Sequence, residues 1–318
     1  MTATTQVTEA PVVKPGGVKE VRRAFSGRTA SILIVLLTIL WTVPTFGVFI
    51  TSFRPAHDVA NSGWWEFFVH PHLTWDNYHT VLFVGGSGVT GGIIPYLVNS
   101  LVITIPATLI SLTIAAMAAY CLAWIRFRGS DTIFFIIFAL QVVPLQMSLV
   151  PLQRFYNLGA HIGSVPIFPA LHLGQHHPIV QIWISHTMFA LPLAVFLLHN
   201  FVAQLPRDLM EAARVDGANH FRIFRTIVLP LITPALASFA IFEFLWVWND
   251  LLVALTFGGY NVKSTPVTSR LQQMIGQYGA NWQLLTAGAF VAIIIPLIVF
   301  FALQRYFVRG LLAGSVKG

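Results

Sequence analysis

Polar side chains suited to contact with a solute occur within one apolar stretch of the chain. Glu243 and Asp250 are seven residues apart, which places both on nearly the same face of a helix, and Trp246 and Asn249 lie near that face. Carboxylates and amides bind hydroxyl groups, and aromatic rings cover the C–H faces of sugars. These four residues, called the acidic stripe below, are a candidate path for a neutral polyol.

The acidic stripe also fits a purely structural role. A charged group in the middle of a bilayer costs about 2.5 to 3.5 kcal/mol, so Glu243 must face protein or water. Gln141, Gln146 and His186 are candidate hydrogen-bond partners on other apolar stretches. In this alternative the Trp-Asn-Asp sequence only shapes the outer end of a helix. The sequence leaves both roles open.

Histidine also gathers in one part of the chain, although the chain lacks the spacing of a metal site. The residues concerned are His161, His172, His176, His177 and His186. No His-x3-His spacing on a helix and no paired cysteine or carboxylate accompanies them. Cys121 is the only cysteine. We therefore predict no metal site and no intrachain disulfide.

A charged segment, EAARVDGANHFRIFRTIVLP at residues 211–230, separates two apolar stretches, although only 9% of the chain is charged. We expect a helix to begin at Pro206, with Asp208 and Glu211 near its positive end. Gly217 can adopt the left-handed conformation that ends a helix. A second helix is expected to follow and to run into the next apolar stretch. The segment therefore predicts a helix, a turn and a helix.

The local chemistry of this segment suits contact with another protein and contact with lipid head groups equally well. Ala212 and Ala213 have almost no bulk, so another protein can approach the backbone closely there. In the alternative, the segment is an amphipathic loop that anchors among lipid head groups through its arginines.

The elements that must position these residues are membrane helices. Hydrophobic residues make up 56% of the 318 residues, far more than a water-soluble core of this size needs. A bilayer core of about 30 Å requires about 20 apolar residues in a helix. The stretches of sufficient length predict six transmembrane helices, at about 31–51, 98–122, 132–152, 179–201, 233–257 and 284–303.

Proline lies away from the ends of five of these six stretches. The positions are Pro44, Pro106, Pro144, Pro192 and Pro296. Proline removes a backbone donor and kinks a helix, which a membrane tolerates beside a neighbouring helix or a water-lined cavity. Kinked helices around a cavity are typical of transporters, but proline is also commoner in membrane helices in general.

Lysine and arginine predict the orientation, because cytoplasmic loops contain an excess of both. One side holds 14 of the 18: Lys14, Lys19, Arg22, Arg23, Arg28, Arg126, Arg128, Arg207, Arg214, Arg222, Arg225, Arg305, Arg309 and Lys317. The other side holds Arg54, Arg154, Lys263 and Arg270. Both termini are therefore predicted to be cytoplasmic, with residues 1–28 as a polar tail. The cations are dispersed beside the spans and form no basic stripe for nucleic acid.

Two longer loops are predicted on the outer side. Residues 52–95 contain Trp-Trp and Phe-Phe pairs that are typical of a membrane interface. Residues 155–206 contain no Asp, Glu, Lys or Arg, but a second crossing there would place the Arg-rich residues 207–225 outside. Prolines and glycines interrupt residues 160–178, which are therefore predicted to be an external loop or an interfacial segment.

The charged segment resembles the signature loop of ATP-binding-cassette importer permeases. That loop reads Glu-Ala-Ala, three residues, Gly, nine residues and Ile-x-Leu-Pro. The matching residues are Glu211, Ala212, Ala213, Gly217, Ile227, Leu229 and Pro230, with Asp216 in the same turn. NSLVITIPATLISLTIAAMAAYCLAWIRFRG and WVWND are similar to the family's second span and to a motif late in its fifth span. QRYFVRGLLAGSVKG is similar to the end of the six-span second permease of maltose-type systems.

The resemblance implies a permease subunit that moves a mono- or oligosaccharide by alternating access across the cytoplasmic membrane of a bacterium. The fold would be an all-α membrane protein with six transmembrane helices and a cytoplasmic helix-turn-helix coupling loop. Residues 29–318 would form the six-span domain, with the coupling loop at 205–230.

The resemblance also implies partners. These are a second related permease, two cytoplasmic ATPase subunits and an external substrate-binding protein, to which the His-rich loop is expected to bind. The glycine run GGSGVTGG lacks the Lys-Ser/Thr pair of a phosphate loop. ATP and Mg would therefore be bound by the ATPase, and this chain would be neither an enzyme nor the holder of a cofactor. The C-terminal tail with Lys317 and Gly318 would reach the ATPase.

Two other classes are the alternatives. An ion-coupled secondary transporter favours inverted repeats or several charged groups at the midplane. A membrane-embedded enzyme needs a paired catalytic constellation. The sequence shows neither pattern.

Overall fold

Long helices dominate the computed structural model of the chain, which describes residues 28–86, 89–125, 127–258, 262–274 and 281–315. Within these residues, five helices are long and apolar enough to cross a membrane, and a bent pair supplies a sixth crossing when it is counted as one span. The five are α2 (Arg28–Phe53), α5 (Ile94–Trp124), α9 (Pro178–Val202), α12 (Leu229–Asn249) and α15 (Trp282–Ser315). The predicted all-α membrane fold is confirmed. The predicted tail up to residue 27, and Lys317 and Gly318, lie outside the described residues.

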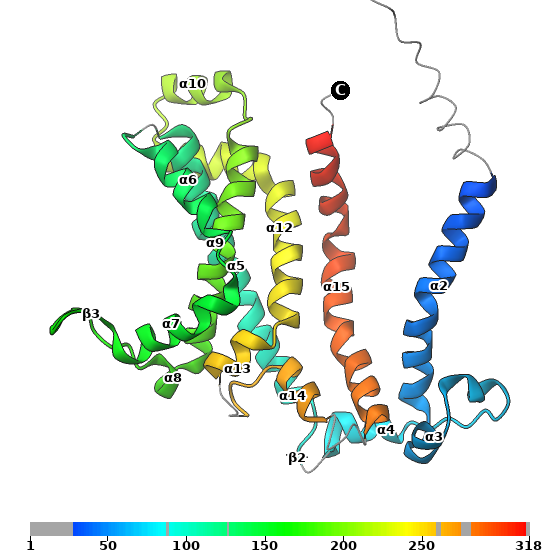
Figure 1. Ribbon diagram of the computed structural model, residues 1–318. Helices are drawn as coiled ribbons and strands as arrows, with labels where there is room; N and C mark the ends of the chain where they lie inside the picture. Colours follow the sequence, from blue (N-terminus) through cyan, green and yellow to red (C-terminus); the bar gives the residue numbers. More distant parts are fainter. Residues whose placement is uncertain (1–27, 87–88, 126, 259–261, 275–280, 316–318) are drawn as a thin grey trace, which may run out of the picture.

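The third predicted span, 132–152, is wrong as a single helix. It is divided into two helices whose axes differ by 104°. They are α6 (Ser130–Leu140) and α7 (Leu145–Leu158). Pro144 has no backbone N–H and disfavours helical backbone in the residue before it, so α6 ends ahead of it. α6 is only about 16 Å long at 1.5 Å per residue, and α7 turns aside from the bundle (Figure 1).

The fifth predicted span, 233–257, also ends earlier than the sequence predicts. α12 stops at Asn249, and Oδ2 of Asp250 accepts hydrogen bonds from the backbone N–H groups of Val253 and Ala254, at 2.9 and 3.3 Å. Aspartate is among the best residues to cap the start of a helix. The helices that follow are α13 (Leu252–Gly258) and α14 (Val267–Met274). The chain therefore turns at Asp250 instead of continuing the span.

Close contacts between α5, α9 and α12 form the core. α5 and α9 meet through small buried residues: Ala107, Ser111, Ala115, Ala116 and Ala119 on α5, and Ala190 and Ala194 on α9. Small side chains let helix backbones approach closely in a membrane, where association depends on packing. α15 packs against α12 and α2, with the rings of Phe49 and Phe290 5.3 Å apart. The remainder of α2 is exposed along most of its length.

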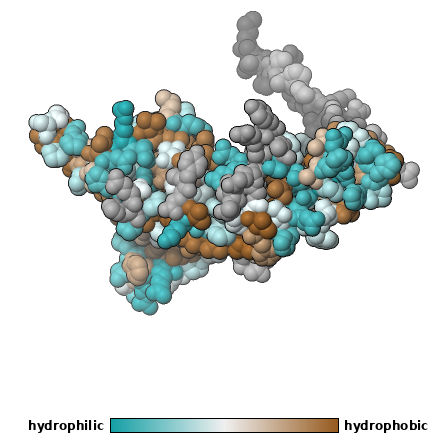
Figure 2. All heavy atoms as spheres, turned by 90° about the horizontal axis from the view of Figure 1, so that it is seen from below, coloured by the Kyte–Doolittle hydropathy of each residue, from teal (hydrophilic) through white to brown (hydrophobic). Residues whose placement is uncertain are grey.

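Hydrogen bonds from Arg54 organise the long loop between α2 and α5. Its buried guanidinium donates to the carbonyl groups of Asp58, Ser62 and Gly63 and to the Ser62 hydroxyl. Asn77 in turn donates to the carbonyl of Arg54 at 2.9 Å. The short elements of this loop are α3 (Ala56–Asn61), η1 (Trp64–Phe68), α4 (Asp76–His79), η2 (Thr80–Val84), β1 (Gly85–Gly86) and β2 (Val89–Thr90). Figure 2 shows this end of the molecule, where hydrophilic residues gather over the region of α3.

A β-hairpin lies between α7 and α9, in the segment that the sequence predicts to be a loop. Its strands are β3 (Ala160–Ile162) and β4 (Val165–Phe168), and the helix after it is α8 (Leu173–His176). The strands pair antiparallel, with an irregular register at Ala160 and His161. All four residues of β4 are exposed. The hairpin projects from the side of the bundle (Figure 1) and contributes little to the core.

The two ends of the described chain lie at the same end of the bundle. Figure 1 shows the start of α2 and the end of α15 at the level of α10 (Arg207–Val215), opposite α3, α4, α13 and α14. This arrangement agrees with the same-side placement that the lysines and arginines predict. The assignment of that side to the cytoplasm stays a prediction.

The hairpin depends on a glycine at position 159. Gly159 has a φ of +72°, and a Cβ added there would lie 2.1 Å from the carbonyl oxygen of Phe168. Gly163 also has a positive φ, +60°, but an added Cβ would meet nothing within 4 Å. We predict that Gly159→Ala destabilises the hairpin by about 3 kcal/mol and that Gly163→Ala does so by about 1 kcal/mol. Thermal unfolding in detergent, with limited proteolysis of the hairpin, measures both, and equal losses would contradict the steric explanation.

Candidate functional site

The charged segment folds as the helix, turn and helix that its sequence predicts. α10 starts after Pro206, and the turn at its end contains Gly217 with a φ of +77°. The side chain of Asn219 accepts a hydrogen bond from the backbone N–H of Arg222 at 2.9 Å and so caps the second helix. The elements after the turn are α11 (His220–Ile223) and the π-helical turn η3 (Phe224–Val228), which leads directly into α12. The segment is thus continuous with a membrane helix.

One face of α10 is buried and the other is exposed. The buried side chains are Met210, which is 2% exposed, and Ala213, which is 9% exposed. Glu211, Ala212 and Asp216 are exposed. Of the two alanines in the motif, therefore, only Ala212 presents a small side chain to the outside. The sequence alone could not distinguish them, because the burial of Ala213 depends on the helices behind it.

Two large apolar side chains extend the exposed surface, and neither is among the residues that the sequence motif predicts. Val215 is 87% exposed and Phe221 is 70% exposed, on either side of the glycine turn. Exposed apolar residues within a polar rim are typical of a protein interaction site. A signal was present in the sequence, since both residues interrupt a charged run. The remaining motif positions lie closer to the span: Ile227 and Leu229 are partly buried, and Pro230 is exposed.

The helix-turn-helix is attached firmly to the membrane helices. Met210, Ala213, Ile223 and Val228 share one buried cluster with residues from the ends of α5 and α9. The Tyr120 hydroxyl of α5 also lies 2.9 Å from Nδ1 of His220. Buried contacts therefore join the segment to the ends of α5 and α9.

A polar cavity of about 710 Å³ lies between α10 and the ends of α5 and α9. Its ionisable lining residues are Asp131, His199, Arg207, Glu211, Arg214 and His220. Among the described residues, no ion pair joins any of these six side chains to another group. Arg207, Glu211 and Arg214 are exposed and remain available to a partner, whereas His220 already contacts the Tyr120 hydroxyl.

The structure divides the acidic stripe into residues with different surroundings. Glu243 is fully buried, and neither carboxyl oxygen has a hydrogen-bond partner among the described residues. It lies close to the Ser111 hydroxyl of α5, which donates instead to the carbonyl of Ala107. Gln141, the first candidate partner, makes no hydrogen bond with Glu243. Glu243 thus faces the contact between helices and not a cavity.

The other end of the stripe has a mainly structural geometry. Besides capping α13, Asp250 lies 3.9 Å from Nε2 of the buried His186, measured to its Oδ2 atom. His186 therefore lies beside Asp250 and not beside Glu243. Asn249 is exposed and donates to the carbonyl of Leu245 in its own helix. The ring of Trp246 meets His186 edge to face, with 6.0 Å between the centroids.

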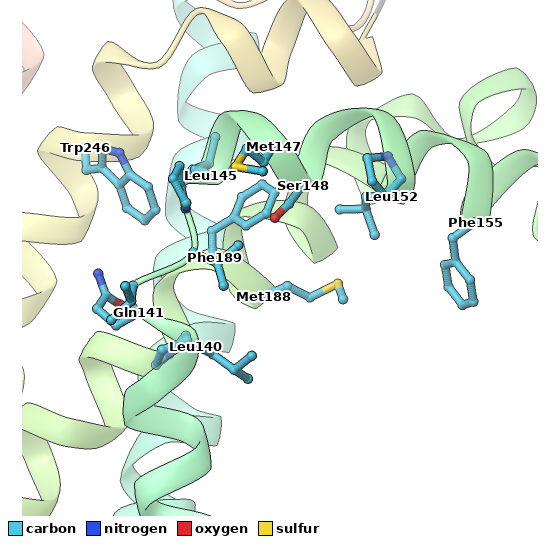
Figure 3. A pocket seen from close by; sticks show the side chains of 15 residues that line it. Leu140, Gln141, Leu145, Met147, Ser148, Leu152, Phe155, Met188, Phe189 and Trp246 are labelled. Atoms are coloured by element: carbon cyan, nitrogen blue, oxygen red, sulfur yellow. The ribbon is translucent and has the colours of Figure 1, made fainter.

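Trp246 is the stripe residue that lines a cavity. This cavity, of about 840 Å³, lies at the break between α6 and α7. Figure 3 shows Trp246 and Gln141 with Met188 and Phe189, which come from α12, the break and α9. The other lining residues are Leu140, Val142, Val143, Pro144, Leu145, Met147, Ser148, Pro151, Leu152, Phe155 and Pro192. The wall is mainly apolar with a few polar groups, as in typical small-molecule sites.

The histidines do not come together in the described part of the chain. No group of three His, Cys, Asp or Glu side chains there has the geometry of a metal site. The nearest approach to a cluster lies in the loop after α2, where His57 and His72 both contact Asp58, at 3.4 and 3.0 Å. The hydrogen bond from His57, with a further contribution from His72, holds the pKa of Asp58 below its ordinary value.

The sequence profile of the binding-protein-dependent transport system inner membrane component matches residues 111–312. The chain is 47% identical over 290 residues to the osmoprotective compounds uptake permease protein GgtD of Synechocystis sp., covering 90% of this chain and 91% of that one. It is 52% identical over 249 residues to the alpha-glucoside transport system permease protein AglG of Rhizobium meliloti, covering 78% of this chain and 61% of that one.

A solved structure has the same fold. It is the crystal structure of a bacterial ABC transporter involved in the import of the acidic polysaccharide alginate, with a TM-score of 0.66 and 19% sequence identity. The match covers 94% of this chain and all of the other. The helix arrangement, the profile match over most of the chain and the two relatives lead to one assignment. This chain belongs to the family of binding-protein-dependent transport system inner membrane components and is a membrane permease.

Proposed function

We propose that the chain is the permease subunit of an ATP-driven importer that moves a neutral sugar or a related polyol by alternating access. The observation that carries this proposal is its relationship to permeases named for osmoprotective compounds and alpha-glucosides, at 47% and 52% identity. The chemistry of the cavity favours a neutral solute. None of its lining residues carries a positive charge, which an acidic polysaccharide would need for its carboxylates.

The proposed complex contains four kinds of subunit. This chain pairs with a second related permease, and two ATPase subunits bind ATP and Mg on the cytoplasmic side, where both termini of this chain lie. An external binding protein delivers the solute. This chain then needs no catalytic residue and no cofactor of its own. The exposed face of α2 and the exposed charged residues of α10 that line the polar cavity provide surfaces for such partners.

The helix-turn-helix is the proposed contact with the ATPase. Glu211, Ala212, Asp216 and Gly217 form the outward surface. Val215 and Phe221 add apolar area to it. Since α11 and η3 continue into α12, closure of the ATPase pair would move α12 through Ile227, Leu229 and Pro230. The contact between the ATPase and the helix-turn-helix would differ with and without ATP, and this difference would shift the equilibrium between the inward-open and outward-open states.

The proposed solute path runs along the cavity at the α6–α7 break. Trp246 supplies an aromatic surface there, and Gln141 supplies an amide that can bind hydroxyl groups. Asn249 is exposed one turn away at the end of α12. Glu243 and Asp250 lie behind this surface and would reach the solute only after α12 moves relative to α5 and α9.

Replacement of Gly217 tests the coupling role. A β-branched residue is strained at its positive φ, so we predict that Gly217→Val inserts normally but lowers solute-stimulated ATP hydrolysis and uptake about tenfold or more, equivalent to about 1.4 kcal/mol. Gly129→Val is the matched control, because Gly129 also has a positive φ, +94°, with open space around it. Reconstituted vesicles with the cognate partners provide both rates. Equal losses in the two variants would refute the assignment of the loop.

The charge of the motif can be tested separately. Glu211→Lys should uncouple ATP hydrolysis from uptake, since it reverses a charge on the partner-facing surface. Asp208→Lys reverses an exposed charge on the same helix outside the motif, and we expect it to retain most of the uptake. Similar uptake in both variants would show that position 211 has no special role.

The solute path is tested at Trp246 and Glu243. We predict that Trp246→Ala lowers the uptake rate by about fivefold, because the solute loses an aromatic surface worth about 1 kcal/mol. Glu243→Gln keeps the side-chain volume, and a change in the relative rates for different sugars is expected if α12 movement exposes this position. Transport identical to wild type would remove Glu243 from the path.

Calorimetric titration of the cognate binding protein with neutral and acidic sugars identifies the solute class.

A further inference from the structure

We propose that α5 is a transmission strut, which carries movement of the α10–α11 turn to residues 262–267 at the opposite end of the bundle. This inference rests on the proposed coupling function of α10. α12 follows the turn directly in the chain, so its movement with the turn needs no further explanation. α5 is about 100 residues away in sequence from the turn, so its participation depends on specific side-chain contacts.

Tyr120 makes the first of these contacts. Its hydroxyl lies 2.9 Å from Nδ1 of His220, the first residue of α11, and its side chain is only 5% exposed. The ring also packs 5.5 Å from the ring of Phe224, the first residue of η3. The hydrogen bond is partly buried, because Tyr120 is buried while His220 is exposed, and such a bond is directional. α5 is therefore held to the segment that leads into α12.

Trp124, one turn further along α5, holds the other side of the same loop. Its Nε1 donates to the carbonyl of Val202 at 3.0 Å. Val202 is the last residue of α9, immediately before the chain leaves for α10. The α10 loop is thus bound to α5 both where it begins and where it ends. A displacement of α10 would pull on α5 from both sides.

At the opposite end, α5 makes equally specific contacts with the segment between α13 and α14. Nδ2 of Asn99 donates to the carbonyl groups of Val262 and Thr265, at 2.7 and 2.9 Å. The Ser100 hydroxyl accepts a hydrogen bond from the backbone N–H of Val267 at 2.8 Å. These bonds fix the outer segment to α5 through its backbone.

The distance between the two sets of contacts matches the membrane. Asn99 and Tyr120 are 21 residues apart on one uninterrupted helix, which is about 30 Å at 1.5 Å per residue and equals the thickness of the hydrocarbon core. Hydrogen bonds from Trp124 to the carbonyl of Val202 and from Trp183 to the carbonyl of Val102 hold α5 and α9 together near both ends, so the two helices can tilt as one unit. α5 can therefore move as one body between a cytoplasmic and an outer attachment.

The first test measures coupling in vesicles that contain the complete complex and its binding protein. We predict that Tyr120→Phe and His220→Phe each lower the number of solute molecules imported per ATP by about threefold, the scale of one hydrogen bond. The double variant should be no worse than either single variant, because both remove the same bond. Tyr156→Phe is the control, since it removes a buried hydroxyl that contacts Ser185 away from α10. Additive losses, or an equal loss in the control, would refute the strut.

The second test measures movement at the far end. Spin labels at the exposed Val262 and Asn61, in a Cys121→Ser background, report their separation with and without ATP. We expect an ATP-dependent change in the wild type that is lost in Tyr120→Phe and in Asn99→Ala. A wild-type complex that neither imports solute nor shows the change would refute the proposed function itself. Normal coupling and a normal change in Tyr120→Phe would refute only the strut.

Discussion

The lack of water in a bilayer core is the constraint on which the rest of this structure depends. Helices cannot associate there by excluding water, so the packing of small residues must hold them together. The alanine and serine row on α5 meets small residues of α9, and this contact forms the centre of the described molecule. α12 completes that centre, and the remaining helices join it from one side or the other. Substituting a bulky residue in this row would separate the helices that support both proposed sites.

The same constraint explains why the break in the third span and the cavity occur together. Backbone that is not helical is tolerated at membrane depth only where protein or a water-lined cavity satisfies it. The chain between Leu140 and Leu145 is such backbone, and it lines the cavity of about 840 Å³. The break between α6 and α7 therefore forms part of the cavity wall, and the cavity in turn is what allows non-helical backbone at this depth in the membrane. A continuous helix at this position would remove the wall that Gln141 contributes.

Local sequence signals predicted the elements well where the outcome depended on local chemistry. Apolar stretches of sufficient length located the membrane helices, and Gly217 and Asn219 carry the turn and cap chemistry of the helix-turn-helix. Proline positions predicted less reliably where a helix is broken. Pro44, Pro106 and Pro192 lie inside continuous helices, whereas Pro144 marks a bend of 104°. The local effect of proline is the same in each case, so the difference arises from the packing around it, which a single sequence does not display.

The sequence also predicted which residues belong to the candidate sites, but not the surroundings of each side chain. The motif residues were found by their spacing, but the direction of each side chain depends on neighbours distant in sequence. Ala213 is buried because α5 and α9 end beneath it, and Asp250 serves as a cap because the chain turns there. Glu243 and Trp246 share a helix face by periodicity, yet one meets α5 and the other meets the cavity. Helical spacing places residues on a face, whereas tertiary contacts determine what that face meets.

The cavity wall combines residues from α6, α7 and the break between them with residues from α9 and α12, and this arrangement supplies a physical basis for alternating access. Trp246 comes from α12, Met188 and Phe189 from α9, and Gln141 from the break. Side chains on a single rigid element could not change their separation, but these three can. In the proposed mechanism a force on α10 reaches α12 through the continuous chain of α11 and η3. A shift of α12 relative to α9 then changes the wall on the Trp246 side while the opposite wall stays in place, so the cavity can open or close without unfolding any helix.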